Sequence, residues 1–120
     1  MTLLVALFGA AGAAARYLVD HAIRSRFPTR FPVATTVVNL TGSFLLGLLV
    51  GVGLTGDWRV LAGVGFCGGY TTFSTAMVET LALPGTRERA LNLVGMFAGC
   101  LLAVAAGAGL GHLAANLPTG

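Results

Sequence analysis

The sequence predicts an all-α integral membrane protein with four transmembrane helices, the third of them broken near its middle. Its mean hydropathy is +0.88 and only 9% of its 120 residues are charged, whereas ordinary soluble domains carry about 25% charged residues. An apolar segment of about 20 residues is long enough to cross a bilayer. Such segments lie at about residues 3–23, 33–54, 60–83 and 90–113 of a single membrane domain, 1–120. Four short helices enclose little interior, so we expect the subunit to assemble with another.

The first span carries a charge within its apolar sequence. Small residues at positions 9–15 precede Arg16, about a turn and a half from the end of the span. An arginine at this depth either extends to the membrane interface or stays inside as a fixed charge that holds an anion or a neighbouring loop. Asp20 lies four residues later, so we expect it to pair with Arg16 on the same helix face.

Asn39 is the most informative residue of the second span. It opens a polar step, Asn39–Ser43, in an otherwise apolar helix. A buried carboxamide must find partners, and its NH2 group offers two donors to an anion. The alternative is an interhelical hydrogen bond that only holds the bundle together.

The third span is interrupted by the segment 65–75. Its centre holds the glycine pair Gly68–Gly69, and each glycine weakens a helix by about 1 kcal/mol relative to alanine. Four hydroxyl residues then surround Phe73, namely Thr71, Thr72, Ser74 and Thr75. We expect the helix to break near 68–75, where its freed carbonyls and amides can bind ions and the hydroxyls can bond the backbone. The alternative is that the glycines serve only close helix packing, as Gly65 and Gly69 would.

Other kinds of site find little support in the sequence. Cys67 and Cys100 lie in separate apolar spans without metal-ligand spacing, so we interpret them as buried thiols. No span brings a nucleophile beside a base, and His21 and His112 lie near opposite ends of the chain, which argues against an enzyme. The fourth span has almost no polar side chain beyond Asn92 and is predicted to be a packing helix.

The arginines predict an orientation in the membrane. The positive charge comes from seven arginines and no lysine, and most of them lie in loops, which indicates membrane topology rather than nucleic-acid binding. The first and third loops hold Arg24, Arg26, Arg30, Arg87 and Arg89, and the opposite side holds Arg59. By the positive-inside rule these two loops are cytoplasmic and both termini face outward.

Three stretches resemble the Fluc fluoride channels, also called the CrcB family. They are GAAGAAARY at 9–17, VNLTGSF at 38–44 and GFCGGYTTFST at 65–75. The resemblance implies a passive, fluoride-selective channel of the bacterial plasma membrane that exports cytoplasmic fluoride and confers fluoride resistance. It also implies an antiparallel dimer of four-helix subunits with two narrow pathways, in contact with membrane lipid.

The resemblance assigns roles to particular residues. Asn39 matches the family's pore asparagine, Phe73 its first pore phenylalanine, and Arg16 the arginine of its first helix. A sodium ion at the dimer centre would be held by the backbone carbonyls of Gly68 and Thr71. The hydroxyls of Thr72, Ser74 and Thr75 would join Asn39 in replacing the water around fluoride. The positive edge of an aromatic ring such as Phe73 would help where no hydroxyl reaches.

Two departures from the family pattern favour a heterodimer. The position of a second pore phenylalanine is Ala76, and the fourth span lacks the tyrosine and serines that many members carry. An antiparallel homodimer also needs a chain that inserts both ways, whereas the arginine bias predicts one orientation. We therefore expect a homologous partner that inserts the opposite way and supplies the missing groups. The alternatives are a non-conducting assembly subunit and a small multidrug-type exporter, although an exporter needs a carboxylate deep in the first span, which has none before Asp20.

Overall fold

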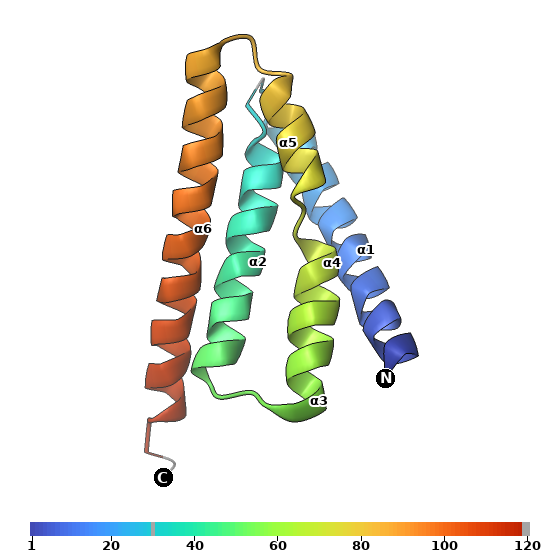
Figure 1. Cartoon of the computed structure of the whole chain (residues 1–120), viewed down its shortest axis with the longest axis vertical. Coiled ribbons are helices and arrows are strands. Elements are labelled where there is room, and N and C mark those ends of the chain that lie inside the picture. The colour runs from blue at the N-terminus through green and yellow to red at the C-terminus, as the bar shows by residue number, and fades with distance from the viewer. Residues whose placement is uncertain (30, 119–120) are drawn as a thin grey trace.

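The computed structural model describes residues 1–29 and 31–118, and in this part of the chain helices are joined by short connections. The elements are α1 (Thr2–Arg26), α2 (Val33–Gly51), α3 (Gly56–Arg59), the π-helix η1 (Val60–Cys67), α4 (Gly68–Tyr70), α5 (Ser74–Leu81) and α6 (Thr86–Ala115). α1, α2 and α6 are each long and apolar enough to cross a membrane. The remaining apolar segment, the third in chain order, runs from α3 to α5 and is bent (Figure 1). The predicted all-α, multi-pass architecture is confirmed at this level.

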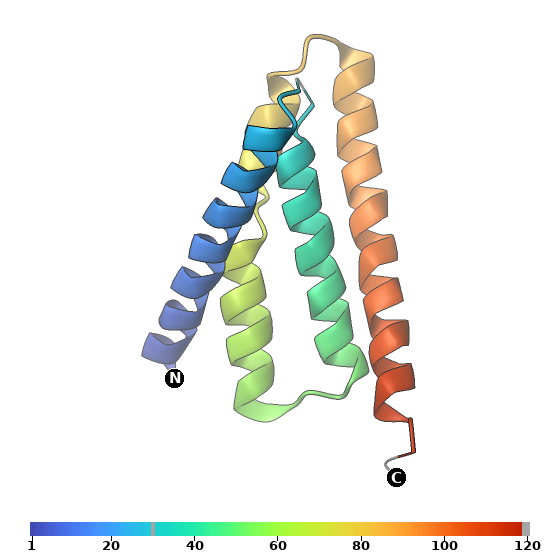
Figure 2. The same cartoon turned by 180° about the vertical axis from the view of Figure 1, so that it is seen from behind.

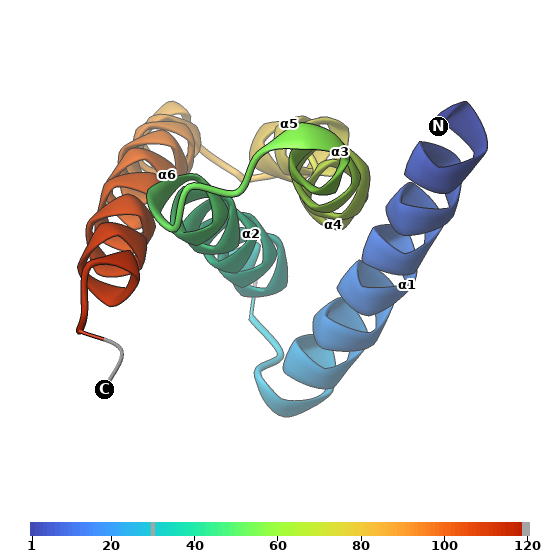
Figure 3. The ribbon, with the colours of Figure 1, turned by 90° about the horizontal axis from the view of Figure 1, so that it is seen from below.

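The helices run between two ends of an elongated molecule (Figures 1 and 2). The start of α1, the end of α6 and the α2–α3 connection lie at one end, with Arg59 of α3 nearby, and the α5–α6 connection lies at the other. Seen from below, α1 splays away from α6, and α2 lies between them (Figure 3). The arginines predicted to be cytoplasmic gather at the end that holds the α5–α6 connection, except for Arg30, which lies outside the described residues. Which side of the membrane this end faces stays a prediction.

Glycines bring the backbones of α2 and α6 into contact. A Cβ atom on Gly47 would collide with the Val104 carbonyl oxygen, and one on Gly107 would collide with the Phe44 carbonyl oxygen. Only a residue without a side chain lets two helices approach this closely, and such small-residue faces are typical of membrane helix pairs. The prediction that the fourth span packs against a neighbouring helix is confirmed.

Glycines also pack the third apolar segment against α1. Gly12 of α1 faces the Phe66 carbonyl oxygen, and Gly69 of α4 faces the Gly9 carbonyl oxygen. The prediction that Gly68 and Gly69 themselves interrupt the helix is wrong, because both are helical. Gly69 serves the close packing that was the alternative, and the contacts with α1 outweigh its low helix propensity.

The interruption begins just after Tyr70. Thr71 adopts an extended conformation (φ −80°, ψ 160°), and the helix resumes at Ser74. The predicted break is therefore present, but it covers residues 71–73 and starts later than the glycine pair.

Candidate functional site

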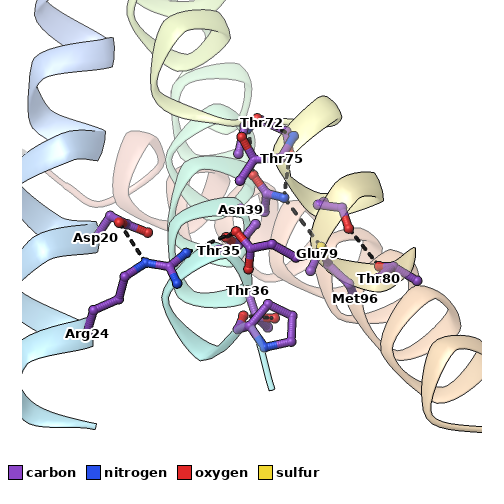
Figure 4. A network of polar contacts seen from close by, with 12 residues as sticks. Asp20, Arg24, Thr35, Thr36, Asn39, Thr72, Thr75, Glu79, Thr80 and Met96 are labelled. Atoms are coloured by element: carbon purple, nitrogen blue, oxygen red, sulfur yellow. Dashed lines mark hydrogen bonds and ion pairs between the residues drawn. The ribbon is translucent and has the colours of Figure 1, made fainter. Parts of the chain in front are cut away.

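The side chain of Asn39 replaces helical hydrogen bonds at the break. Its Nδ2 donates to the Thr72 carbonyl oxygen at 2.9 Å, and the Thr72 amide donates to Asn39 Oδ1 at 2.8 Å (Figure 4). Asn39 is only 8% exposed, so the carboxamide satisfies both backbone groups of one residue where water is excluded. A polar residue of α2 thus stabilises the broken segment of the chain.

Two threonine hydroxyls form further hydrogen bonds with the backbone at the break. The Thr75 amide donates to Thr72 Oγ1 at 3.2 Å, and Thr71 Oγ1 donates to the Cys67 carbonyl oxygen at 2.9 Å. The expectation that hydroxyls of this cluster bond the backbone is confirmed for these two. The Thr72 hydroxyl takes the place of a helical acceptor for the Thr75 amide, whereas the Thr71 hydroxyl shares the Cys67 carbonyl with the Thr71 amide.

These side-chain hydrogen bonds also leave two backbone carbonyls without their helical donors. In an unbroken helix the amide of residue i donates to the carbonyl of residue i−4. The Thr72 amide would then donate to Gly68, and the Thr75 amide would donate to Thr71, but both donate to side chains instead. The carbonyls of Gly68 and Thr71 consequently lose their helical donors and become available to a ligand.

The break joins two helix ends of opposite polarity. α4 ends with carbonyl groups that carry partial negative charge, and α5 begins with amides that carry partial positive charge. Carbonyls of an unwound segment suit a cation, whereas helix N-termini attract anions. This short stretch of backbone therefore offers groups for ions of both signs.

Two cavities meet at Thr72. The first, of about 210 Å³, includes Arg16, Arg24 and Thr75 in its wall. The second, of about 230 Å³, includes Asn39 and Phe73 and is otherwise mostly apolar. Thr72 lines both cavities, so the Asn39–Thr72 bridge lies between a charged chamber and an apolar one.

A charged network borders the first cavity, whose wall includes Asp20, Arg24 and Thr35 but not Glu79. Arg24 contacts Asp20 Oδ2 at 2.8 Å through Nε and Glu79 Oε1 at 2.9 Å through Nη2, and Thr35 Oγ1 donates to Glu79 Oε1 at 2.7 Å (Figure 4). The prediction that Asp20 pairs with Arg16 is wrong, since Asp20 pairs with Arg24. A helical ion pair is favoured when the acid precedes the base by four residues, and this order holds for Asp20–Arg24.

Sequence reasoning assigned no function to Thr35 or Arg24. A usable signal was the spacing of Thr35 and Asn39, which lie four residues apart on one face of α2. Glu79 lies four residues after Thr75 on α5 in the same way. These two polar faces, one on α2 and one on α5, lie against each other beside the break. The i,i+4 spacing of polar residues on both helices is the signal that could have indicated this.

Helix α6 also anchors the broken segment, which corrects its interpretation as a packing helix alone. The second donor of Asn39 points at Met96 Sδ, 3.4 Å away. Asn92 Nδ2 donates to Thr80 Oγ1 at 2.8 Å, and Thr80 Oγ1 donates to the Ala76 carbonyl oxygen at 2.6 Å. α5 is therefore tied to α6 by polar contacts as well as by packing.

The remaining predicted site residues lie around this centre. Ser74 and Thr75 are exposed in the first turn of α5. Arg16 is half-buried in the wall of the first cavity. The side chain of Phe73 is 77% exposed, so this aromatic ring projects from the subunit and is not packed within it.

Comparison with known proteins places the chain in a family. A family profile described as "CrcB-like protein, Camphor Resistance (CrcB)" matches residues 3–108. A protein of Leifsonia xyli named "Fluoride-specific ion channel FluC 1" is 48% identical over 115 residues, which is 92% of this chain and 84% of that protein. One of Cutibacterium acnes named "Fluoride-specific ion channel FluC 2" is 44% identical over 120 residues, covering 92% of this chain and 98% of that protein. A third, "Fluoride-specific ion channel FluC 2" of Mycobacterium bovis, is 43% identical over 102 residues, 85% of this chain and 81% of that protein. The chain therefore belongs to the CrcB family.

Proposed function

We propose that the chain is a subunit of a passive, fluoride-selective channel that lets fluoride leave the bacterial cytoplasm. Curated relatives across most of its length carry the name fluoride-specific ion channel. The observation that supports this function best is the meeting of two cavities at a break bridged by Asn39. A path for a small anion needs donors that replace its water, and the break gathers such donors. The family assignment gives no support to a multidrug exporter.

The donors around the break fit an anion that passes without binding too tightly. The first cavity attracts an anion through Arg16 and offers the hydroxyls of Thr72 and Thr75. One N–H of Asn39 is bonded to the thioether of Met96, which is a weak acceptor. Fluoride can displace this partner at little cost. Conduction requires such moderate binding, because an ion that enters must also leave.

The sodium site implied by the family fits the two carbonyls at the break. Gly68 and Thr71 are the residues whose helical donors are diverted to side chains. Their carbonyls would hold the ion together with the same pair from a second subunit, and the bound cation would supply positive potential near the path. The side chains of Asn39 and Thr72 accept hydrogen bonds from the amides that would otherwise bond these two carbonyls.

We expect the Glu79 carboxylate to leave fluoride passage unhindered only because Arg24 balances its negative charge. In Arg24→Gln the Glu79 carboxylate, bonded to Thr35 in the cavity wall, keeps its negative charge without a cation beside it, so it repels an approaching anion. Since the Arg24 side chain is half exposed, fluoride efflux from liposomes should fall several-fold and not vanish. Arg24→Gln/Glu79→Gln should recover most of the loss. A double variant as slow as the single one would contradict this role.

We further propose that the working channel is an antiparallel heterodimer. Phe73 projects from the subunit at 77% exposure, as a group inserted into a partner would. Ala76 lines the second cavity, where a larger side chain from a partner would complete the wall. The one-sided arginines favour a partner that inserts the opposite way.

Reconstitution tests both levels of the proposal. The chain is purified alone, and also together with a CrcB-family subunit of opposite arginine bias, and each preparation is placed in liposomes loaded with fluoride or with chloride. We expect fast fluoride efflux and no chloride efflux from the pair, and slow efflux from the chain alone. Full efflux from the chain alone would refute the heterodimer, and no efflux from either preparation would refute the channel.

The presence of alanine at position 76 keeps a second function open, that of a non-conducting assembly subunit. Asn39→Ala in the reconstituted pair distinguishes the two. A conducting subunit loses fluoride efflux while the pair stays assembled by size-exclusion chromatography. If efflux is unchanged, the chain is a scaffold.

A further inference from the structure

The wall of the second cavity concentrates the sulfur atoms of the chain. The sequence has three methionines and two cysteines, and two of these methionines and one cysteine line this cavity, namely Met77, Met96 and Cys100. The cavity, of about 230 Å³, is large enough for a metal ion and its ligands. The proposed fluoride pathway uses only Met96 of these three residues, as a weak acceptor for Asn39, and gives no role to Met77 or Cys100.

The three sulfur residues come from two helices that face each other. Met96 and Cys100 lie four residues apart on one face of α6. Met77 lies on α5, which Asn92 and Thr80 tie to α6. The Met96 sulfur is 3.4 Å from Asn39 Nδ2, so its thioether is oriented toward the Asn39 carboxamide, as Figure 4 illustrates.

We propose that this cavity binds a soft monovalent cation, Cu(I) or Ag(I), through Met77, Met96 and Cys100. Thiolate and thioether ligands select soft ions. Hard cations prefer carboxylates, and the described residues that line the cavity include no aspartate or glutamate. The ligand set therefore discriminates against magnesium and calcium.

Binding leaves no net charge in the apolar wall. The S–H bond of Cys100 breaks, a sulfur–metal bond forms, and the proton passes to water. The thiolate and the monovalent cation then cancel, whereas a divalent ion would leave a buried charge that is costly to place there. Binding should consequently release one proton per ion and weaken as the pH falls.

Silver nitrate titrated into the purified full chain in chloride-free detergent solution tests the site. Calorimetry should show one tightly bound Ag⁺ per chain and about one proton released. Cys100→Ser should weaken binding at least tenfold, and Met96→Leu and Met77→Leu, which keep side-chain volume, should each weaken it severalfold. Cys67→Ser is the matched control, because Cys67 is a buried thiol on η1, and it should bind as the wild type does.

The outcomes separate this site from the transport function, because the titration needs no fluoride. Loss of binding in Cys67→Ser, unchanged binding in Cys100→Ser, or no binding to the wild type would overturn the proposal. In liposomes, Ag⁺ should slow fluoride efflux through the wild type and spare Cys100→Ser, since the occupied cavity contains Phe73 and Asn39. Equal inhibition of both proteins would also count against it.

Discussion

Asn39→Leu should abolish measurable fluoride efflux and weaken the fold. The substitution removes both hydrogen bonds to Thr72, leaving a part-buried amide and a part-buried carbonyl unsatisfied. Each costs about 1–3 kcal/mol. The loss of a donor from the proposed ion path adds a barrier of similar size, and about 1.4 kcal/mol corresponds to a tenfold change in rate. Efflux measured with a fluoride electrode and thermal unfolding in detergent should both show the effect.

Asn116→Leu provides the matched control. Asn116 is an exposed carboxamide that bonds the His112 carbonyl oxygen at the end of its own helix, far along the chain from the break. Its replacement should leave efflux and unfolding near wild type. If Asn39→Leu conducted like this control, the bridged break would not be the ion path.

The second large effect is expected for Gly12→Ala. A Cβ atom at this position would collide with the Phe66 carbonyl oxygen and lie 2.9 Å from the Tyr70 amide nitrogen. Backbone cannot yield as a flexible side chain does, so α1 must move away from the broken segment. Overpacking of this kind costs about 1–3 kcal/mol or more, and unfolding in detergent should occur at a lower temperature.

Gly109→Ala tests the same chemical change where space is open. Nothing lies within 4 Å of a Cβ atom there. Alanine favours the helix by about 0.8–1.0 kcal/mol over glycine, so the unfolding temperature should stay the same or rise. Opposite signs at the two positions would establish the close approach of α1, and equal stabilisation of both variants would contradict it.

The fold class could be predicted because hydropathy and segment length are local properties. The broken third segment was predictable because hydroxyl groups clustered inside an apolar span compete with the helix for backbone partners. The exact position of the break was harder to predict from the sequence. Gly68 and Gly69 suit both an interruption and close packing, and the contact of Gly69 with α1, which the sequence does not display, favours packing there.

The site was predictable in its residue types and less so in its pairings. Asn39 was singled out, but its partner is Thr72, 33 residues away in the sequence, and nothing local to a buried carboxamide indicates which group it will bond. Asp20 has an arginine four residues away on either side, and both side-chain order and Glu79 favour Arg24. The contribution of Asn92 was missed because one polar residue in an apolar helix gives little signal by itself.

The interruption of the third segment is complete within a single polypeptide. The bonds that replace the helical ones at Thr72 and Thr75 come from Asn39 and from Thr72 itself, and none requires a second chain. A subunit therefore needs no companion to form the break. The proposed dimer would then form by docking of preshaped surfaces, without the slower step of unwinding a helix inside the lipid.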